Sequence, residues 1–253
     1  MFSLVLIGIM LPFFGTAIGS SAVFAMKKTR RQALADCLCG FSGGVMIASS
    51  LWSLLLPAIE GSQHLASLAF LPSCVGFLSG TAFMIFCEKI SHRLQKRGSQ
   101  LKKGPDTAFA VTVHNFPEGM AVGLAFAAFL SFRDELSLSS ALSLSVGIAI
   151  QNIPEGAIVS LPLLSDRIGK TRAFLTGVIS GAVEPLGAVM AIFFASLFSS
   201  LMPYFLSFAA GTMIFVVMNE LSEEMHGEKG RSRGMVFFAI GFAVMMSLDV
   251  ALG

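Results

Sequence analysis

Eight long apolar runs separated by short polar segments dominate the chain. Each has about the 20 residues that an α-helix needs to cross the hydrocarbon core of a bilayer. The runs lack the apolar–polar alternation of transmembrane β-strands, and only helices and closed barrels satisfy their backbone groups in lipid. The pattern predicts an all-α integral membrane protein with eight transmembrane helices, at about 2–25, 34–57, 65–90, 106–131, 137–164, 171–198, 201–222 and 234–252.

The amino-acid composition supports this interpretation. Hydrophobic residues make up 55% of the 253 residues and charged residues only 13%, whereas a soluble domain carries about 25% charged residues. We therefore expect a lipid bilayer to surround the chain. The connections between the runs are short, which indicates one transmembrane domain over residues 1–253 without an appended soluble domain. We expect no nucleic-acid partner.

Lysine and arginine residues predict the orientation of the helices. Sixteen of the seventeen basic residues fall in alternate connections between the apolar runs, and only Arg133 falls on the other side. Cytoplasmic loops of membrane proteins carry the excess of Lys and Arg, so these connections are predicted to be cytoplasmic. Both termini then lie outside the cytoplasm. The same segregation supports the count of eight helices.

Two six-residue stretches in the middle of the chain nearly repeat each other. Residues 114–119 read HNFPEG and residues 151–156 read QNIPEG. A weaker match joins residues 44–47 (GVMI) in the second run with residues 211–214 (GTMI) in the seventh. The matched runs cross the membrane in opposite directions, which is typical of transporters built from inverted repeats. We therefore predict a 3+2+3 bundle, in which a central pair of helices separates two related sets of three.

The central pair of predicted helices carries polar side chains at bilayer depth. A charged side chain at the centre of a membrane helix costs at least about 2.5–3.5 kcal/mol on insertion scales, so it indicates a functional site. Spacings of three and four residues place the polar side chains of each helix on one face. They are His114, Asn115 and Glu118 on one helix and Gln151, Asn152 and Glu155 on the next.

These side chains form a suitable set of metal ligands. Nitrogen with several oxygen donors suits zinc, iron or manganese better than magnesium or calcium. Two glutamates that can bridge predict a pair of adjacent metal positions at the midplane of the membrane. Glu184, which precedes Pro185 in the sixth run, lies at the same depth and is a predicted further ligand. Met46 in the second run offers a thioether, either as a ligand or as a packing residue.

Three glutamates and a histidine also close the seventh run, at its predicted cytoplasmic end. They form either a relay by which a metal ion leaves the site or an ordinary solvated helix end. The residues are Glu220, Glu223, Glu224 and His226.

Three other interpretations of the polar cluster remain open. It could be structural, as an interhelical hydrogen-bond cluster, although glutamates on several helices would then need protons or a cation to offset their repulsion. It could belong to a membrane-embedded di-metal enzyme, but the chain lacks a His-Glu-x-x-His motif. It could be the proton relay of a non-metal transporter, but imidazole and amides fit a cation better. We favour a divalent metal transporter over an enzyme.

The motifs at residues 114–119 and 151–156 resemble those of the ZIP (Zrt-, Irt-like) divalent metal transporters. Residues 183–185 (VEP), residues 15–19 (GTAIG) and the acidic end of the seventh run fit this family too. The resemblance covers the whole chain, and the short loops are similar to those of prokaryotic members. It implies homodimers in the plasma (inner) membrane that take up zinc and related metals into the cytosol. It also implies an elevator-like motion of helices 1, 4, 5 and 6 against helices 2, 3, 7 and 8.

The resemblance also implies which residues hold each metal ion. Many family members have histidine where this chain has Gln151, and glutamine is a weaker and harder ligand. That departure implies broader use of zinc, cadmium, iron, manganese and cobalt. One metal would be held by His114, Glu118, Gln151 and Glu155 with Met46, and the second by Asn115, Asn152 and Glu184, with Glu118 and Glu155 bridging.

Overall fold

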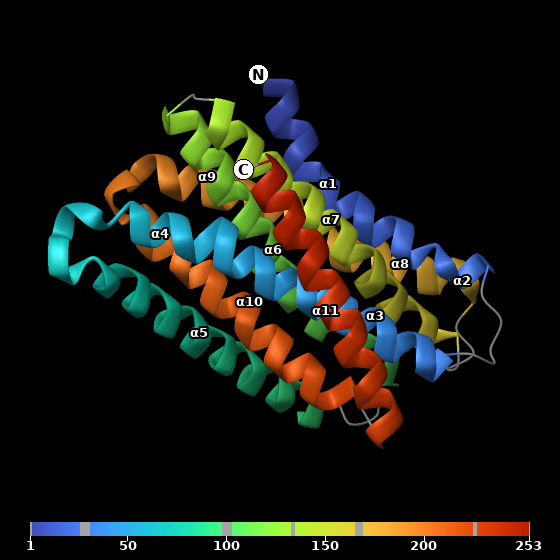
Figure 1. The fold of residues 1–253 in the computed structure, drawn as a ribbon. Coiled ribbons are helices and arrows are strands. Elements are labelled where there is room, and N and C mark those ends of the chain that lie inside the picture. Colours follow the sequence, from blue (N-terminus) through green and yellow to red (C-terminus); the bar gives the residue numbers. More distant parts are fainter. Residues whose placement is uncertain are drawn as a thin grey trace.

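The computed structural model describes residues 2–25, 31–97, 103–132, 135–164, 169–224 and 227–252, and every regular element in these ranges is a helix (Figure 1). The elements are α1 (Phe2–Ser20), α2 (Ala22–Ala25), α3 (Arg31–Ser49), the π-helix η2 (Ser50–Leu55), α4 (Leu56–Glu60), the 3₁₀-helix η3 (Gln63–Leu68), α5 (Phe70–Arg97), α6 (Lys103–Phe132), α7 (Glu135–Leu163), α8 (Lys170–Gly181), α9 (Val183–Leu197), the 3₁₀-helix η4 (Ser199–Leu201), α10 (Met202–Glu224) and α11 (Gly227–Leu252).

Seven stretches of described residues are long and apolar enough to cross a membrane, which confirms a multi-pass membrane protein. Helix α6 is not among them, and the side chains of its residues 103–111 lie outside the description. The seven are Phe2–Ala25, Leu34–Glu60, Phe70–Ile90, Leu138–Leu163, Lys170–Leu197, Met202–Asn219 and Arg231–Leu252.

Several of the predicted helices differ from the structure. The helix predicted at 2–25 is divided at Ser21 into α1 and α2, and the one predicted at 34–57 contains the π-helix η2 and continues to Glu60. The helix predicted at 65–90 begins instead at Phe70, because the preceding residues form the separate 3₁₀-helix η3, in which Ala66 has a φ of 51°. The helix predicted at 171–198 is divided at Ala182 into α8 and α9. Pro185 has no N–H to bond to the carbonyl of Gly181, which favours the end of α8 at this point.

Four helix pairs pack with their backbones in close approach: α1 with α7, α6 with α9, α3 with α11, and α5 with α10. In each pair one helix carries two glycines four residues apart, and a Cβ atom at either would run into the main chain of the partner helix. Small residues at this spacing let membrane helices pack closely. The glycines are Gly15 and Gly19 on α1, Gly119 and Gly123 on α6, Gly40 and Gly44 on α3, and Gly76 and Gly80 on α5.

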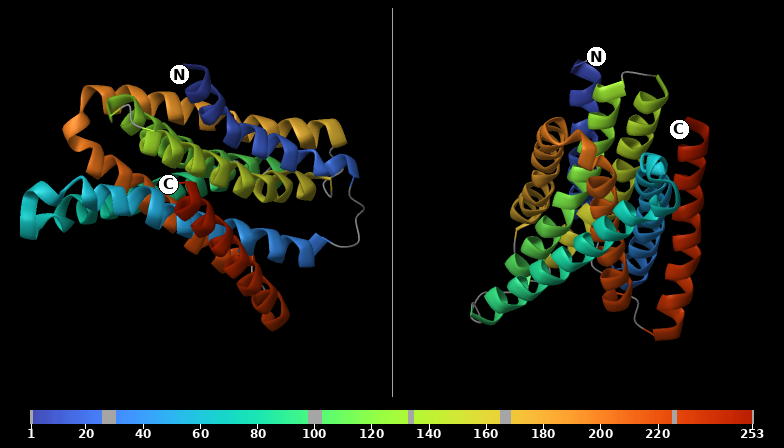
Figure 2. Two further views of the ribbon diagram at one scale, coloured as in Figure 1. Left: turned by 45° about the horizontal axis from the view of Figure 1, so that its top comes forward. Right: turned by 90° about the vertical axis from the view of Figure 1, so that its left-hand side faces the viewer.

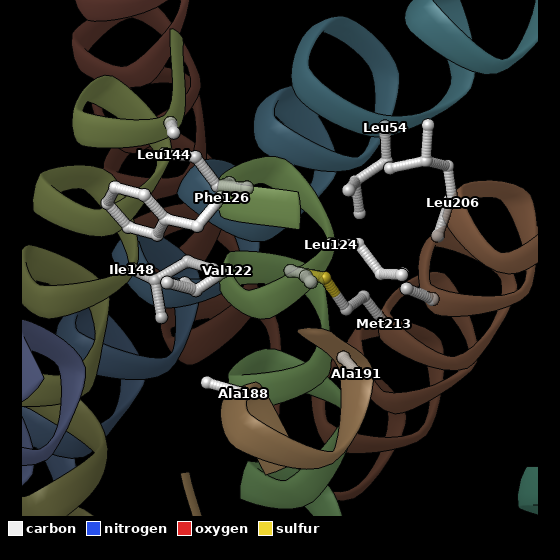
Figure 3. Packing of buried hydrophobic residues seen from close by; sticks show 14 of the residues in the cluster. Leu54, Val122, Leu124, Phe126, Leu144, Ile148, Ala188, Ala191, Leu206 and Met213 are labelled. Atoms are coloured by element: carbon white, nitrogen blue, oxygen red, sulfur yellow. The ribbon is translucent and has the colours of Figure 1, made fainter. Parts of the chain in front are cut away.

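Helix α6 lies at the centre of the apolar core. Figure 3 shows Phe126 of α6 beside Leu144 of α7, while Leu124 of α6 points toward Met213 of α10 and Leu206. All five side chains are buried. The apolar side chains of α6 therefore join the helices on both of its sides.

The helix pairs form two groups. The left view of Figure 2 shows α1, α6, α7 and α8–α9 on the upper side of the molecule and α3, α10 and α11 on the lower side. Between α6–α9 of one group and α5–α10 of the other lies a cavity of about 230 Å³. Apolar side chains line it, among them Phe116, Leu124, Phe194 and Phe208. A second apolar cavity, of about 390 Å³, lies within the first group, where residues of α1, α6 and α9 line it.

The close approach of α5 and α10 makes a prediction about stability. In Gly80→Ala the new Cβ would meet the backbone carbonyl of Phe208, and overpacking of this kind costs about 1–3 kcal/mol. We expect a lower melting temperature for the purified protein. Gly169→Ala is the control, because no atom lies within 4 Å of a Cβ at Gly169. Equal melting temperatures for the two variants would contradict the packing described here.

Candidate metal centre

The two repeated motifs lie on α6 and α7, and their polar side chains are inside the bundle. His114 is half-buried, and Glu155 is 6% exposed. Together with Glu184 of α9, the remaining polar side chains of the motifs are fully buried: Asn115 and Glu118 on α6, and Gln151 and Asn152 on α7. The polar side chains that the sequence singles out therefore point away from lipid.

Gln151 joins the two motif glutamates. Its Nε2 atom donates hydrogen bonds to Oε1 of Glu118 at 2.8 Å and to Oε1 of Glu155 at 3.3 Å. The amide thus lies between a carboxylate of α6 and a carboxylate of α7. This arrangement brings both predicted bridging residues to one place, because one donor group reaches both.

Glu184 forms a second polar group with residues of α1, α6 and α7. Its Oε1 atom accepts hydrogen bonds from Thr16 Oγ1 at 2.7 Å and from Asn115 Nδ2 at 3.0 Å. Asn152 also approaches this carboxylate, and its Nδ2 atom donates to the backbone carbonyl of Pro12 at 3.4 Å. The residues predicted for the second metal position therefore lie together, around the start of α9.

Three buried oxygen atoms in these two groups have no hydrogen-bond donor among the described residues. They are Asn115 Oδ1, Gln151 Oε1 and Glu184 Oε2. Buried polar atoms are nearly always satisfied, and an unsatisfied one costs about 1–3 kcal/mol. All three atoms are acceptors, so a cation in each of the two groups would supply the partner that they lack. The polar cluster is therefore suited to bind positive charge.

The amides are needed to complete the donor set. Among the described side chains, no group of three or more His, Cys, Asp and Glu residues could hold a metal ion without other ligands. The glutamates are instead divided, with Glu118 and Glu155 around Gln151, and Glu184 beside Asn115. Each group therefore combines carboxylate and amide oxygens.

Two hydroxyl groups at the site are not among the residues predicted as ligands. Thr16 of α1 donates to Glu184, and Ser42 of α3 donates to Oε1 of Glu155 at 2.6 Å. Met46, the predicted thioether ligand, is fully buried one helical turn after Ser42. Thr16 lies in the 15–19 stretch that resembles the ZIP pattern, but nothing in the sequence distinguishes Ser42 from the other serines of its helix.

The predicted exit residues cannot be placed from the structure. Glu220, Glu223 and Glu224 belong to the last turns of α10, and their side chains lie outside the described part. His226 lies outside the described residues altogether. Their role stays a prediction.

The chain is similar to known metal transporters. A family model described as "ZIP Zinc transporter" matches residues 107–249, which is more than half of the chain. Zinc transporter ZIP11 of Xenopus tropicalis is 32% identical over 327 residues, covering 98% of this chain and 97% of the relative. Zinc transporter ZIPB of Bordetella bronchiseptica is 33% identical, covering 95% and 79%. Zinc transporter GufA of Myxococcus xanthus is 33% identical, covering 94% of each.

The buried carboxylates make a prediction about ligand-dependent stability. Glu184→Gln removes a charge from a buried position, so we expect the metal-free variant to melt no lower than the wild type. Zinc at 100 times its dissociation constant should stabilise the wild type by about 2.7 kcal/mol and the variant by less. Glu60→Gln, at an exposed glutamate of α4, is the control. Equal stabilisation of Glu184→Gln and wild type by zinc would rule out Glu184 as a ligand.

Proposed function

The chain belongs to the ZIP zinc transporter family, and from this premise we propose that it carries zinc and related divalent metals into the cytosol through a two-metal site. The family consists of transporters, so the chain is not an enzyme and the di-metal enzyme is set aside. The observation that carries the proposal is the buried group of carboxylate and amide oxygens on α6, α7 and α9. It offers a metal ion a replacement for its hydration shell inside a membrane bundle.

The first metal ion is proposed to lie between α6 and α7, held by His114, Glu118, Gln151 and Glu155, with Met46 from α3. The position of the Gln151 amide between the two carboxylates supports this assignment. A carboxylate pair that accepts hydrogen bonds from one –NH₂ group can accept a cation at the same place. On metal binding the amide would turn, so that its oxygen rather than its nitrogen faces the ion.

The second metal ion is proposed to be held by Asn115, Asn152 and Glu184, with Glu118 and Glu155 bridging the two positions. The hydrogen bond between Asn115 and Glu184 and the unsatisfied oxygens of both residues support this position. Oxygen and imidazole donors suit zinc, iron, manganese and cobalt, and the Met46 sulfur adds affinity for cadmium. We therefore propose a transporter with broader metal use than a strict zinc carrier.

We propose eight crossings in an inverted 3+2+3 arrangement. Helix α6 is the eighth span, since its 30 residues measure about 45 Å along the axis and it packs along α7 and α9. In this arrangement α1 corresponds to α9, α3 to α10, α5 to α11 and α6 to α7. The α1–α7 pair then corresponds to the α9–α6 pair, and the α3–α11 pair corresponds to the α10–α5 pair. Gly44 and Gly211 of the matched GVMI and GTMI stretches support this relation, because they contact Phe238 of α11 and Phe77 of α5.

We propose that the two groups of helices slide against each other in an elevator-like motion. One group would contain α1, α2, α6, α7, α8 and α9, and the other α3, α4, α5, α10 and α11. Support comes from the four glycine-lined backbone contacts, all of which lie within a group. Both ends of the chain lie at the same end of the bundle in the right view of Figure 2.

The remaining expectations complete the proposal. Residues 1–253 form one transport domain, with both termini outside the cytoplasm in a plasma (inner) membrane, and two copies form a homodimer. The metal leaves past Glu220, Glu223, Glu224 and His226. A proton-coupled transporter without a metal substrate is the rival, and it is less favoured because an imidazole and several amide oxygens suit a metal cation better than a proton relay.

Zinc uptake tests the proposed function directly. Proteoliposomes with wild-type protein should accumulate labelled zinc, and Glu155→Ala should reduce the initial rate at least about tenfold, because a metal ligand is lost. Glu60→Ala, at an exposed glutamate, should transport like the wild type. Wild-type rates in Glu155→Ala would defeat the assignment of the site.

The glutamine at residue 151 makes a separate prediction about metal preference. Gln151→His replaces a neutral oxygen ligand with an imidazole, which zinc binds more tightly than manganese does. We expect the ratio of zinc to manganese uptake to rise. A ratio that stays the same would show that residue 151 does not contact the transported ion.

A further inference from the structure

One hydrogen bond joins the site to the opposite group of helices. Ser42 of α3 donates from Oγ to Oε1 of Glu155 on α7 at 2.6 Å, and both side chains are buried. The distance is at the short end for an O–H···O bond and is typical of one to a carboxylate. Ser42 therefore holds one oxygen of a proposed metal ligand in a fixed position.

The same oxygen accepts a second hydrogen bond. Gln151 Nε2 lies 3.3 Å from Glu155 Oε1, so both lone pairs of Oε1 are engaged. In the metal-free protein, Oε1 of Glu155 is therefore occupied by two donors. When Gln151 turns its amide toward a metal ion, one lone pair of Oε1 becomes available, while the Ser42 bond still holds this oxygen in place.

We propose that Ser42 is a specificity-determining positioning residue, which disfavours chelation of one metal ion by both oxygens of Glu155 and leaves each oxygen to bind one of the two bridged ions. The inference rests on the proposed function, in which Glu155 is a ligand. Zinc is commonly four-coordinate and is satisfied by single-oxygen carboxylate ligands. Manganese prefers six oxygen ligands, which a carboxylate supplies more readily when both of its oxygens are available. Ser42 thus favours zinc over manganese, and it partly offsets the harder ligand at Gln151.

The experiment compares metal affinities of the purified full chain in detergent. Dissociation constants for Zn²⁺ and for Mn²⁺ are measured by titration calorimetry for wild type, Ser42→Ala and Ser42→Thr. Loss of a residue that holds a metal ligand lowers affinity about 10–100-fold, so we expect weaker zinc binding in Ser42→Ala and a zinc-to-manganese affinity ratio at least about tenfold lower. Ser42→Thr keeps the hydroxyl and should keep the wild-type ratio.

Ser50→Ala is the matched control. Ser50 is equally buried in the same span, but its hydroxyl donates to the backbone carbonyl of Met46 at 2.7 Å, within its own helix. Its removal should leave the ratio unchanged. Melting temperatures of the metal-free variants establish that each is folded, and Ser42→Ala removes only one oxygen atom.

The other possible results would contradict either the role of Ser42 or the proposed metal site. An unchanged ratio in Ser42→Ala, or an equal fall in Ser50→Ala or Ser42→Thr, would overturn the role of the Ser42 hydroxyl. Glu155→Ala separates this from a failure of the proposed function. If Glu155→Ala loses zinc binding while Ser42→Ala behaves like wild type, only the inference about Ser42 is wrong. If Glu155→Ala still binds zinc normally, the proposed site itself is wrong.

Discussion

Buried carboxylates at the depth of the membrane are the constraint on which the rest of the structure depends. Glu118, Glu155 and Glu184 are between 0% and 6% exposed, and a charge in that position is costly unless it is paired or binds a cation. Each carboxylate accepts a hydrogen bond from a side chain on a helix other than its own. The three glutamates can therefore be present only because helices on all sides cover them and supply polar partners.

Close backbone packing is what allows such complete coverage. A Cβ at Gly119 would run into the main chain at Glu184, and one at Gly156 into the main chain at Thr16. These glycines directly follow the two motif glutamates in the sequence, so the contacts that bring α9 and α1 close also bring Glu184 and Thr16 to the site. The packing residues and the proposed ligands are thus parts of one arrangement.

The boundary between the two groups of helices has a different character. It has no glycine-lined backbone contact in the part of the chain that the structure describes. The polar links across it include hydroxyl hydrogen bonds from Ser42 to Glu155, from Ser143 to Asp249 at 3.3 Å, and from Ser139 to the backbone carbonyl of Leu252. Bonds of this kind can be broken and remade singly, whereas interlocked backbones cannot. The difference accords with movement between the groups rather than within them.

The sequence by itself determined the membrane class, the approximate spans, and the polar faces of the two central helices. These follow from local regularities, namely the length of apolar runs and the three- and four-residue spacing within a helix. Only the tertiary structure decided that Asn115 meets Glu184, that Thr16 and Ser42 hold carboxylates, and that the sixth span is divided at Ala182. Such contacts join residues far apart in the chain. They depend on how neighbouring helices dock and rotate, and the apolar pattern of a membrane helix specifies neither, because lipid and protein interior are equally apolar.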